Sequence, residues 1–156
     1  MTLATVGLGS NLDPERRLAF ALDRLRALGT LTAVSSLIQT APVGDLDQPD
    51  YLNGVARIEV DMTPEAFKQA LYAIERDAGR DRTRQRTPYG PVELDLDLLL
   101  WGDAVLTFGS KPWHVPARGL LEHAFVAVPL AEIAPDERHP ETGETFAQIA
   151  ARLAAR

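Results

Sequence analysis

Three acidic residues alternate with leucines in the segment Glu93–Leu100, which reads ELDLDLLL. On a β-strand successive side chains point to opposite faces, so Glu93, Asp95 and Asp97 share one face and the leucines pack the other. Aspartate is depleted in strands, and neighbouring like charges on one face repel. Mg²⁺ relieves such repulsion because it prefers carboxylate oxygens. The segment by itself is compatible with a metal site or with a solvated acidic face on an edge strand.

A run of arginines precedes this acidic segment. Arg80, Arg82, Arg84 and Arg86 occupy every second position, and from Arg76 to Arg86 five arginines and two aspartates give a local charge of +3. Guanidinium groups suit phosphate oxygens and stay charged at any working pH. A solvated charged loop is the alternative. A basic loop that leads directly into a carboxylate strand instead favours phosphoryl-type transfer from a nucleotide. No phosphate-binding lysine loop is present, and Gly7-Leu8-Gly9 lacks the third glycine of a dinucleotide fingerprint.

An aromatic residue and an amide, Tyr51 and Asn53, end the segment DQPDYLN (47–53). They could stack a flat heterocycle and hydrogen-bond its edge, although packing and turn residues are the commoner role for such a pair. The three histidines, His114, His123 and His139, have no zinc-ligand spacing and form no hydrolytic triad with a hydroxyl and an acid.

Composition bounds the remaining possibilities. The 156 residues, 46% hydrophobic and 24% charged, predict a single globular domain over 1–156. We expect no membrane span and no secretory signal. The absence of cysteine excludes disulfides, a thiol nucleophile and a cysteine-ligated metal, and fits a cytoplasmic protein. A net charge of −6 argues against broad coating of nucleic acid or membrane, but not against one anionic ligand at a local basic patch.

The chain alternates between strand and helix patterns, in the order β-α-β-β-α-β. We expect the strands at Leu3–Leu8, Leu31–Thr40, residues 53–61 and Glu93–Trp101, and the helices from Asp13 to Gly29, from Thr63 to Gly79 and from Phe146 onward. Ala104–Leu106 would close a small hairpin, and residues 107–145 would be irregular. Arg57 and Glu59 should face solvent, opposite Ala56 and Ile58. The predicted fold is an α+β, ferredoxin-like sandwich with a mixed or antiparallel sheet covered on one face.

Six blocks taken in order resemble the 6-hydroxymethyl-7,8-dihydropterin pyrophosphokinase family of folate biosynthesis. They are VGLGSNL (6–12), QTAPVG (39–44), DQPDYLNGV (47–55), IERDAGRDR (74–82), YGPVELDLDLLLWG (89–102) and FVAVPLAEIAP (125–135). The resemblance implies transfer of the pyrophosphoryl group of ATP to the pterin hydroxymethyl group, with release of AMP and use of two Mg²⁺ ions. It also implies a ferredoxin-like monomer whose loops Ala41–Asp50 and Arg80–Val92 close over the substrates.

The resemblance also assigns roles to residues of this chain. Asp95 and Asp97 would hold the metal, and Asp97 would help to deprotonate the hydroxyl. The pterin would meet Tyr51, Phe125, Asn53, Thr40 and Val43. The nucleotide would meet Glu75, Arg80, Arg82 and His114, with the next arginine at Arg84 or Arg86 because this loop is longer than in the family. Arg82 and Arg86 would serve in catalysis.

Three positions depart from the family pattern, which usually has Arg, His and Arg where this chain has Val92, Ala117 and His123. We expect a slower enzyme, or compensation by His114, Arg118, Lys111 and the additional loop arginines. One alternative is a weakened homologue that binds pterin or ATP without efficient turnover. A second, an RNA-binding ferredoxin-like module, is disfavoured by the acidity and by the lack of a basic-aromatic strand.

Overall fold

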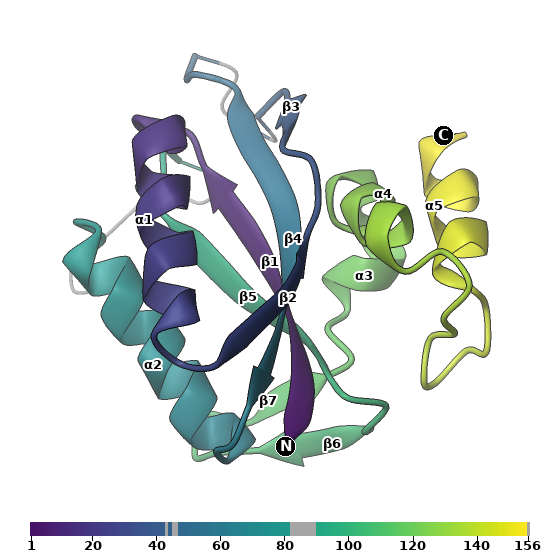
Figure 1. Cartoon of the computed structure of the whole chain (residues 1–156). Coiled ribbons are helices and arrows are strands. Elements are labelled where there is room, and N and C mark those ends of the chain that lie inside the picture. Colours follow the sequence, from purple (N-terminus) through teal and green to yellow (C-terminus); the bar gives the residue numbers. More distant parts are fainter. Residues whose placement is uncertain (43, 45–46, 82–89, 156) are drawn as a thin grey trace.

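The chain forms an antiparallel sheet with helices on both faces (Figure 1). A computed structural model describes residues 1–42, 44, 47–81 and 90–155. In chain order the elements are β1 (Thr2–Ser10), α1 (Pro14–Arg26), β2 (Thr30–Val34), β3 (Ile38–Thr40), β4 (Tyr51–Val60), α2 (Pro64–Asp77), β5 (Asp95–Trp101), β6 (Leu106–Phe108), β7 (Trp113–Val115), α3 (Gly119–Glu122), α4 (Ala124–Ile133) and α5 (Phe146–Ala154). The main sheet runs β2-β4-β1-β5, with β3 also pairing to β4. The predicted α+β class and antiparallel pairing are confirmed.

The first face of the sheet packs against α1 and α2. Buried side chains of β1, β4 and β5, including Val6, Ile58 and Leu96, meet Leu18 of α1 and Phe67 of α2 in one hydrophobic cluster. The helix boundaries follow local chemistry. Thr63 caps α2 by accepting a hydrogen bond from Ala66 N, and a proline occupies the first turn of each helix. At the start of α1 the Asp13 carboxylate makes no capping hydrogen bond and pairs with Arg16 instead.

The second face is covered as well, contrary to the prediction of a sheet covered on one face. Leu120 of α3, Leu130 of α4 and Phe146 of α5 pack against Leu99 and Leu100 of β5 in a second cluster. The prediction that residues 107–145 are irregular is wrong, because this segment contains β7, α3 and α4. Pro129 lies inside α4 and hid the helical pattern, since proline is rare in helix interiors.

Two further predictions about strands are wrong in detail. The expected strand Leu31–Thr40 is interrupted between Val34 and Ile38. Ser35 N still donates to Val55 O at 2.9 Å, but Val55 N donates in return to the side-chain Oγ of Ser35. The hairpin pairs Leu106–Phe108 with Trp113–Val115 and does not pair Ala104–Leu106 with the acidic strand. Arg57, expected to face solvent, is only 7% exposed because the second helical layer covers it.

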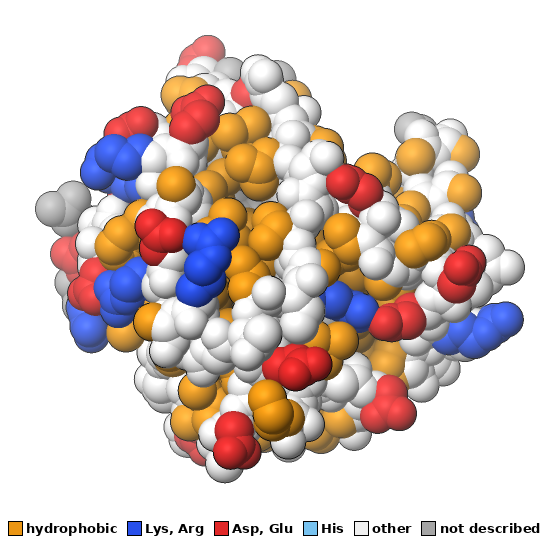
Figure 2. Space-filling model, viewed as in Figure 1, with side chains coloured by type: hydrophobic (Ala, Val, Ile, Leu, Met, Phe, Trp, Pro, Cys, Tyr) orange, Lys and Arg blue, Asp and Glu red, His pale blue; other side chains and the backbone are white. Residues whose placement is uncertain are grey.

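The surface seen in Figure 2 carries Lys and Arg side chains interspersed with Asp and Glu, and no extended field of one sign. Within the described ranges, no helix combines the length and the apolar character that crossing a bilayer requires.

Candidate active site

The acidic strand β5 lies at the edge of the main sheet, and its neighbour β1 contains two glycines, Gly7 and Gly9. Asp95 is paired with Gly9 and Asp97 with Gly7 across β1 and β5, and Gly9 is paired on its other side with Asn53 of β4. A Cβ atom on Gly9 would lie 3.0 Å from Asn53 Oδ1 and 3.9 Å from Asp95 Cβ. The missing side chain therefore leaves bare backbone between the amide of Asn53 and the carboxylate of Asp95.

The role of Gly9 is missed when Gly7 and Gly9 are compared only with a dinucleotide-binding fingerprint. The available signal was the placement of two glycines on alternate positions of one strand. That pattern leaves one face of the strand without side chains and marks a place where a ligand can approach the backbone.

Arg80 joins the acidic strand to the end of α2. Its Nη1 donates to Asp95 Oδ1 at 3.0 Å, to Glu75 Oε2 at 3.1 Å and to Leu94 O at 3.2 Å. Glu75 is 1% exposed and also accepts from Leu96 N at 2.8 Å. Burial opposes the charge of Arg80, but Asp95 and Glu75 outweigh it and raise the pKa of this guanidinium. Glu75 thus holds the Arg80 guanidinium in place against the carboxylate of Asp95.

Asp97 carries the strongest electrostatic perturbation at the site. It is open to solvent through the cavity that it lines, yet protein surrounds it on most sides. Reduced hydration and then the negative charge of Asp95 raise the pKa of Asp97 to about 7, while Lys68 acts in the opposite direction. Near neutral pH Asp97 is therefore only partly ionised, and a further cation beside it would favour its charged form.

The donor set fits Mg²⁺ bound jointly by protein and phosphate. Asp95 and Asp97 supply two hard carboxylate groups on one face of β5. In the described part of the chain no cluster of three or more His, Cys, Asp or Glu side chains is arranged to hold a metal. Mg²⁺ commonly takes one or two carboxylates and completes its shell with phosphate oxygens and water. The site matches that pattern better than a structural metal cage.

Two of the residues expected to meet the pterin ring, Tyr51 and Asn53, lie at the start of β4. Asn53, 7% exposed, donates from Nδ2 to Thr40 Oγ1 at 2.7 Å, and the Tyr51 hydroxyl donates to Gly90 O at 3.0 Å. Burial, and after it the charge of Asp95, raises the pKa of Tyr51. Phe125 lies in the first turn of α4, where its ring stacks on His123 with centroids 4.8 Å apart.

A buried asparagine connects the two loops that border the site. Asn11 is 1% exposed. Its Nδ2 donates to Gln48 Oε1 at 2.8 Å and to Pro49 O at 3.0 Å, while its Oδ1 accepts from Val92 N at 2.9 Å. No local pattern reveals this role of Asn11, because a Ser-Asn pair after a strand is also an ordinary turn signal.

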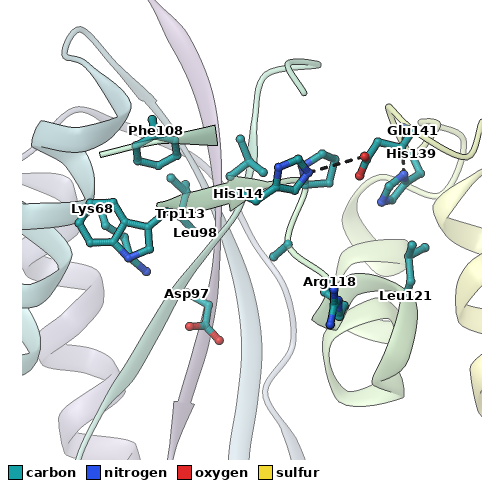
Figure 3. A pocket seen from close by; sticks show the side chains of 13 residues that line it. Lys68, Asp97, Leu98, Phe108, Trp113, His114, Arg118, Leu121, His139 and Glu141 are labelled. Atoms are coloured by element: carbon teal, nitrogen blue, oxygen red, sulfur yellow. Dashed lines mark hydrogen bonds and ion pairs between the residues drawn. The ribbon is translucent and has the colours of Figure 1, made fainter. Parts of the chain in front are cut away.

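A cavity of about 630 Å³ opens beside Asp97 (Figure 3). Its walls comprise Lys68, Asp97, Leu98, Phe108, Trp113, His114, Val115, Pro116, Ala117, Arg118, Leu121, His139 and Glu141. His114 is held by Thr107, with 3.0 Å between Nδ1 and Oγ1, and its Nε2 lies 3.6 Å from Glu141 Oε2. The volume is within the usual range for small-molecule sites.

The structure brings most of the predicted site residues together. Asp95, Glu75 and Arg80 form one connected group, Asn53 and Thr40 a second, and Asp97 and His114 line the cavity. Val43, Arg82, Arg84 and Arg86 lie outside the described residues. Of the three departures from the family pattern, Ala117 lines the cavity, Val92 is hydrogen-bonded to Asn11 and His123 stacks on Phe125.

Comparison with solved structures agrees with this fold. Chains of HPPK-DHPS from Plasmodium falciparum superpose with TM-scores of 0.82 and 0.77, at 12% identity, and are matched over 99% and 100% of this chain. This chain spans less than half of their length, 46% and 44% respectively.

Comparison with sequences shows closer relatives. The chain is 41% identical over 139 residues to the 2-amino-4-hydroxy-6-hydroxymethyldihydropteridine pyrophosphokinase of Pseudomonas aeruginosa, which covers 87% of this chain and 83% of the relative. It is 38% identical over 156 residues to the protein of the same name from Methylorubrum extorquens, and that match covers 98% of this chain and 94% of the relative. Residues 5–135 match the family model described as 7,8-dihydro-6-hydroxymethylpterin-pyrophosphokinase. The chain therefore belongs to the 7,8-dihydro-6-hydroxymethylpterin-pyrophosphokinase family.

Proposed function

We propose that this chain transfers the pyrophosphoryl group of ATP to the hydroxymethyl group of 6-hydroxymethyl-7,8-dihydropterin, giving AMP and the pterin diphosphate for folate synthesis. The observation that carries the proposal is the row Asn53–Gly9–Asp95 across β4, β1 and β5. It puts an amide suited to a heterocycle edge and a carboxylate suited to a phosphate-bound metal on either side of Gly9, one strand apart. Two substrates held over Gly9 would meet there.

The reaction exchanges one phosphorus–oxygen bond for another. The hydroxymethyl oxygen forms a bond to the β-phosphorus, the bond from that phosphorus to the bridging oxygen of the α-phosphate breaks, and AMP leaves. Such transfers depend on in-line positioning and on neutralisation of charge. We assign Tyr51, Phe125, Asn53, Thr40 and Val43 to hold the pterin, and a carboxylate oxygen of Asp97 to accept the hydroxyl proton.

Asp95 and Asp97 would hold two Mg²⁺ ions, which when bound neutralise the phosphates and orient them. On the nucleotide side we assign Glu75, Arg80, Arg82, His114 and either Arg84 or Arg86. His114 and Arg118 line the same cavity as Ala117, which supports the proposal that they supply donors missing at position 117. We further propose a cytoplasmic location, which the cysteine-free composition supports, and a monomeric state.

The test is a direct assay of AMP and pterin diphosphate formed from Mg²⁺-ATP and 6-hydroxymethyl-7,8-dihydropterin. We expect equal amounts of both products, little AMP without the pterin, and loss of turnover after removal of Mg²⁺ with EDTA. Asp95→Asn and Asp97→Asn should each lower kcat by at least about 100-fold, because a lost charge-assisted contact in a transition state costs about 1.5–3 kcal/mol and the metal also weakens. Stoichiometric release of ADP in place of AMP would contradict the proposal.

A further inference from the structure

Lys68 projects from α2 into the cavity beside Asp97 but has no role in the assignments above (Figure 3). Its ammonium lies 5.3 Å from the centroid of the Tyr72 ring, one helical turn away, and 5.9 Å from that of Trp113 on β7. These cation–π contacts hold the charge against an aromatic surface rather than in bulk water.

The charge of Lys68 differs from those of the other cations lining the cavity. His114 faces Glu141 and Arg118 faces Glu122, at 3.6 and 3.9 Å respectively. Lys68 has no carboxylate within ion-pair distance among the residues that the structure describes. Its three N–H donors are therefore available to a ligand in the cavity.

The surroundings of Lys68 suit a flat heterocycle better than a phosphate. Phe108 and Trp113 meet with ring centroids 5.7 Å apart, and Leu98 adds an aliphatic surface to the same wall. Aromatic rings favour stacking with a planar base, and a donor at the edge of the base can meet a ring nitrogen. Phosphates have the carboxylate-bound metal and the guanidinium groups as their partners.

We propose that Lys68 is a nucleotide-binding residue that donates a hydrogen bond to the base of the bound nucleoside triphosphate, which stacks beside Trp113. This inference rests on the proposed function, because it takes ATP as the ligand of the cavity. It adds a base-recognition residue that lies outside every motif used to recognise the family.

Gln69 offers a matched control, because it is the next residue of α2, is exposed and does not line the cavity. Binding of Mg²⁺-ATP, Mg²⁺-AMP and Mg²⁺-tripolyphosphate would be measured by calorimetry for the parent, Lys68→Met, Lys68→Arg and Gln69→Met. We expect Lys68→Met to weaken the binding of ATP and of AMP by a similar factor of about 3- to 10-fold, the value of one hydrogen bond, and to leave the binding of tripolyphosphate unchanged. Lys68→Arg should retain most of the affinity for ATP, and Gln69→Met all of it.

Two results would overturn the inference. Unchanged ATP affinity in Lys68→Met would show that the ammonium does not touch the nucleotide. An equal loss for tripolyphosphate would move the contact to the phosphates and refute recognition of the base. Melting temperatures of the variants show whether each one is folded. Failure of the parent itself to bind Mg²⁺-ATP would instead refute the proposed function.

Discussion

At the scale of single residues, the site combines groups that sequence spacing reveals with groups that it hides. Asp95 and Asp97 were predictable because acids alternating with leucines are unusual in a strand. Gly9 and Asn11 were not, because each is defined by what it meets across the sheet or between loops. A residue whose role is to leave space or to bridge distant segments has no local pattern of its own.

The raised pKa of Asp97 predicts that metal-free protein loses stability as pH rises. Its folded pKa is about 7 against 3.8 for the ordinary group. The folded state therefore binds more protons between these values, and the free energy of unfolding should fall as pH increases from about 4 to 7. Solvent reaches Asp97 through the cavity and screens the effect. We therefore expect the free energy of unfolding to fall by about 1–2 kcal/mol over this pH range.

Urea unfolding in EDTA at pH 5 and pH 8 tests this prediction. Asp97→Asn should be more stable than the parent at pH 8 and close to it at pH 5, although it should be inactive. Mg²⁺-ATP should stabilise the parent at pH 8 by mass action and stabilise the variant less. The same pH dependence in both proteins would show that Asp97 is not its source.

Gly9→Ala should weaken pterin binding while leaving the fold intact. The added Cβ would press on Asn53 Oδ1 at 3.0 Å, and the amide must shift by a few tenths of an ångström away from Thr40. We expect the pterin dissociation constant to rise about 10-fold, the loss of one well-placed hydrogen bond. Gly7→Ala is the matched control, because the atoms nearest to its Cβ would be side-chain carbons of Leu99, at 3.4 Å or more. Fluorescence titration would give the pterin dissociation constant of each variant. Equal dissociation constants for Gly9→Ala and Gly7→Ala would show that the space at Gly9 is not needed for pterin binding.

At the scale of secondary-structure elements, the antiparallel sheet aligns residues that are distant in sequence. β1 lies between β4 and β5, so it separates Asn53, proposed to meet the pterin, from Asp95, proposed to hold the metal. The order of strands and helices was predictable from hydrophobic periodicity. The interruption at Ser35 and the true hairpin partners were not, because they depend on pairing with Val55 and on the register of β6 with β7.

Asn11 should couple the two loops around the site. Asn11→Ala removes an acceptor of the Val92 N–H and the donor to Gln48 and Pro49, and leaves buried polar groups unsatisfied. We expect a loss of about 1–3 kcal/mol in stability and a fall in kcat of about 10-fold or more. Amide hydrogen exchange should be faster in Asn11→Ala than in the parent, both at residues 47–52 and at residues 90–94. Acceleration on only one of them would show that Asn11 supports each loop separately.

At the scale of the whole molecule, the second helical layer turns a sheet with one predicted solvent face into one that is buried on both sides. Leu99, Leu100 and Val55 supply its apolar contacts. The sequence suggested otherwise because Arg57 and Glu59 alternate with apolar residues on β4, as in a half-buried strand. Burial of Arg57 depends on a partner, Glu137, that lies 80 positions further along the chain.

The Arg57–Glu137 pair should therefore anchor the C-terminal layer, and its strength should depend on pH. Arg57 donates to Thr5 Oγ1 at 3.1 Å and to both carboxylate oxygens of Glu137 at 2.7 and 2.6 Å. Those hydrogen bonds lower the pKa of Glu137, although its side chain is 52% exposed. The pair is fully formed above the ordinary glutamate pKa and is lost as pH falls through the lowered value.

Glu137→Gln should lower the free energy of unfolding by about 1–2 kcal/mol at pH 7, a value reduced from that of a fully buried pair because solvent screens Glu137. The deficit should shrink as the pH falls through the lowered pKa of Glu137, because Glu137 of the parent then also becomes neutral. Glu122→Gln is the control, because its partner Arg118 is 88% exposed at 3.9 Å and the pair should contribute little. Urea unfolding of all three proteins at pH 7 and pH 3.5 measures both effects. A deficit of the same size at the two pH values would mean that the glutamate acts through shape and not through its charge.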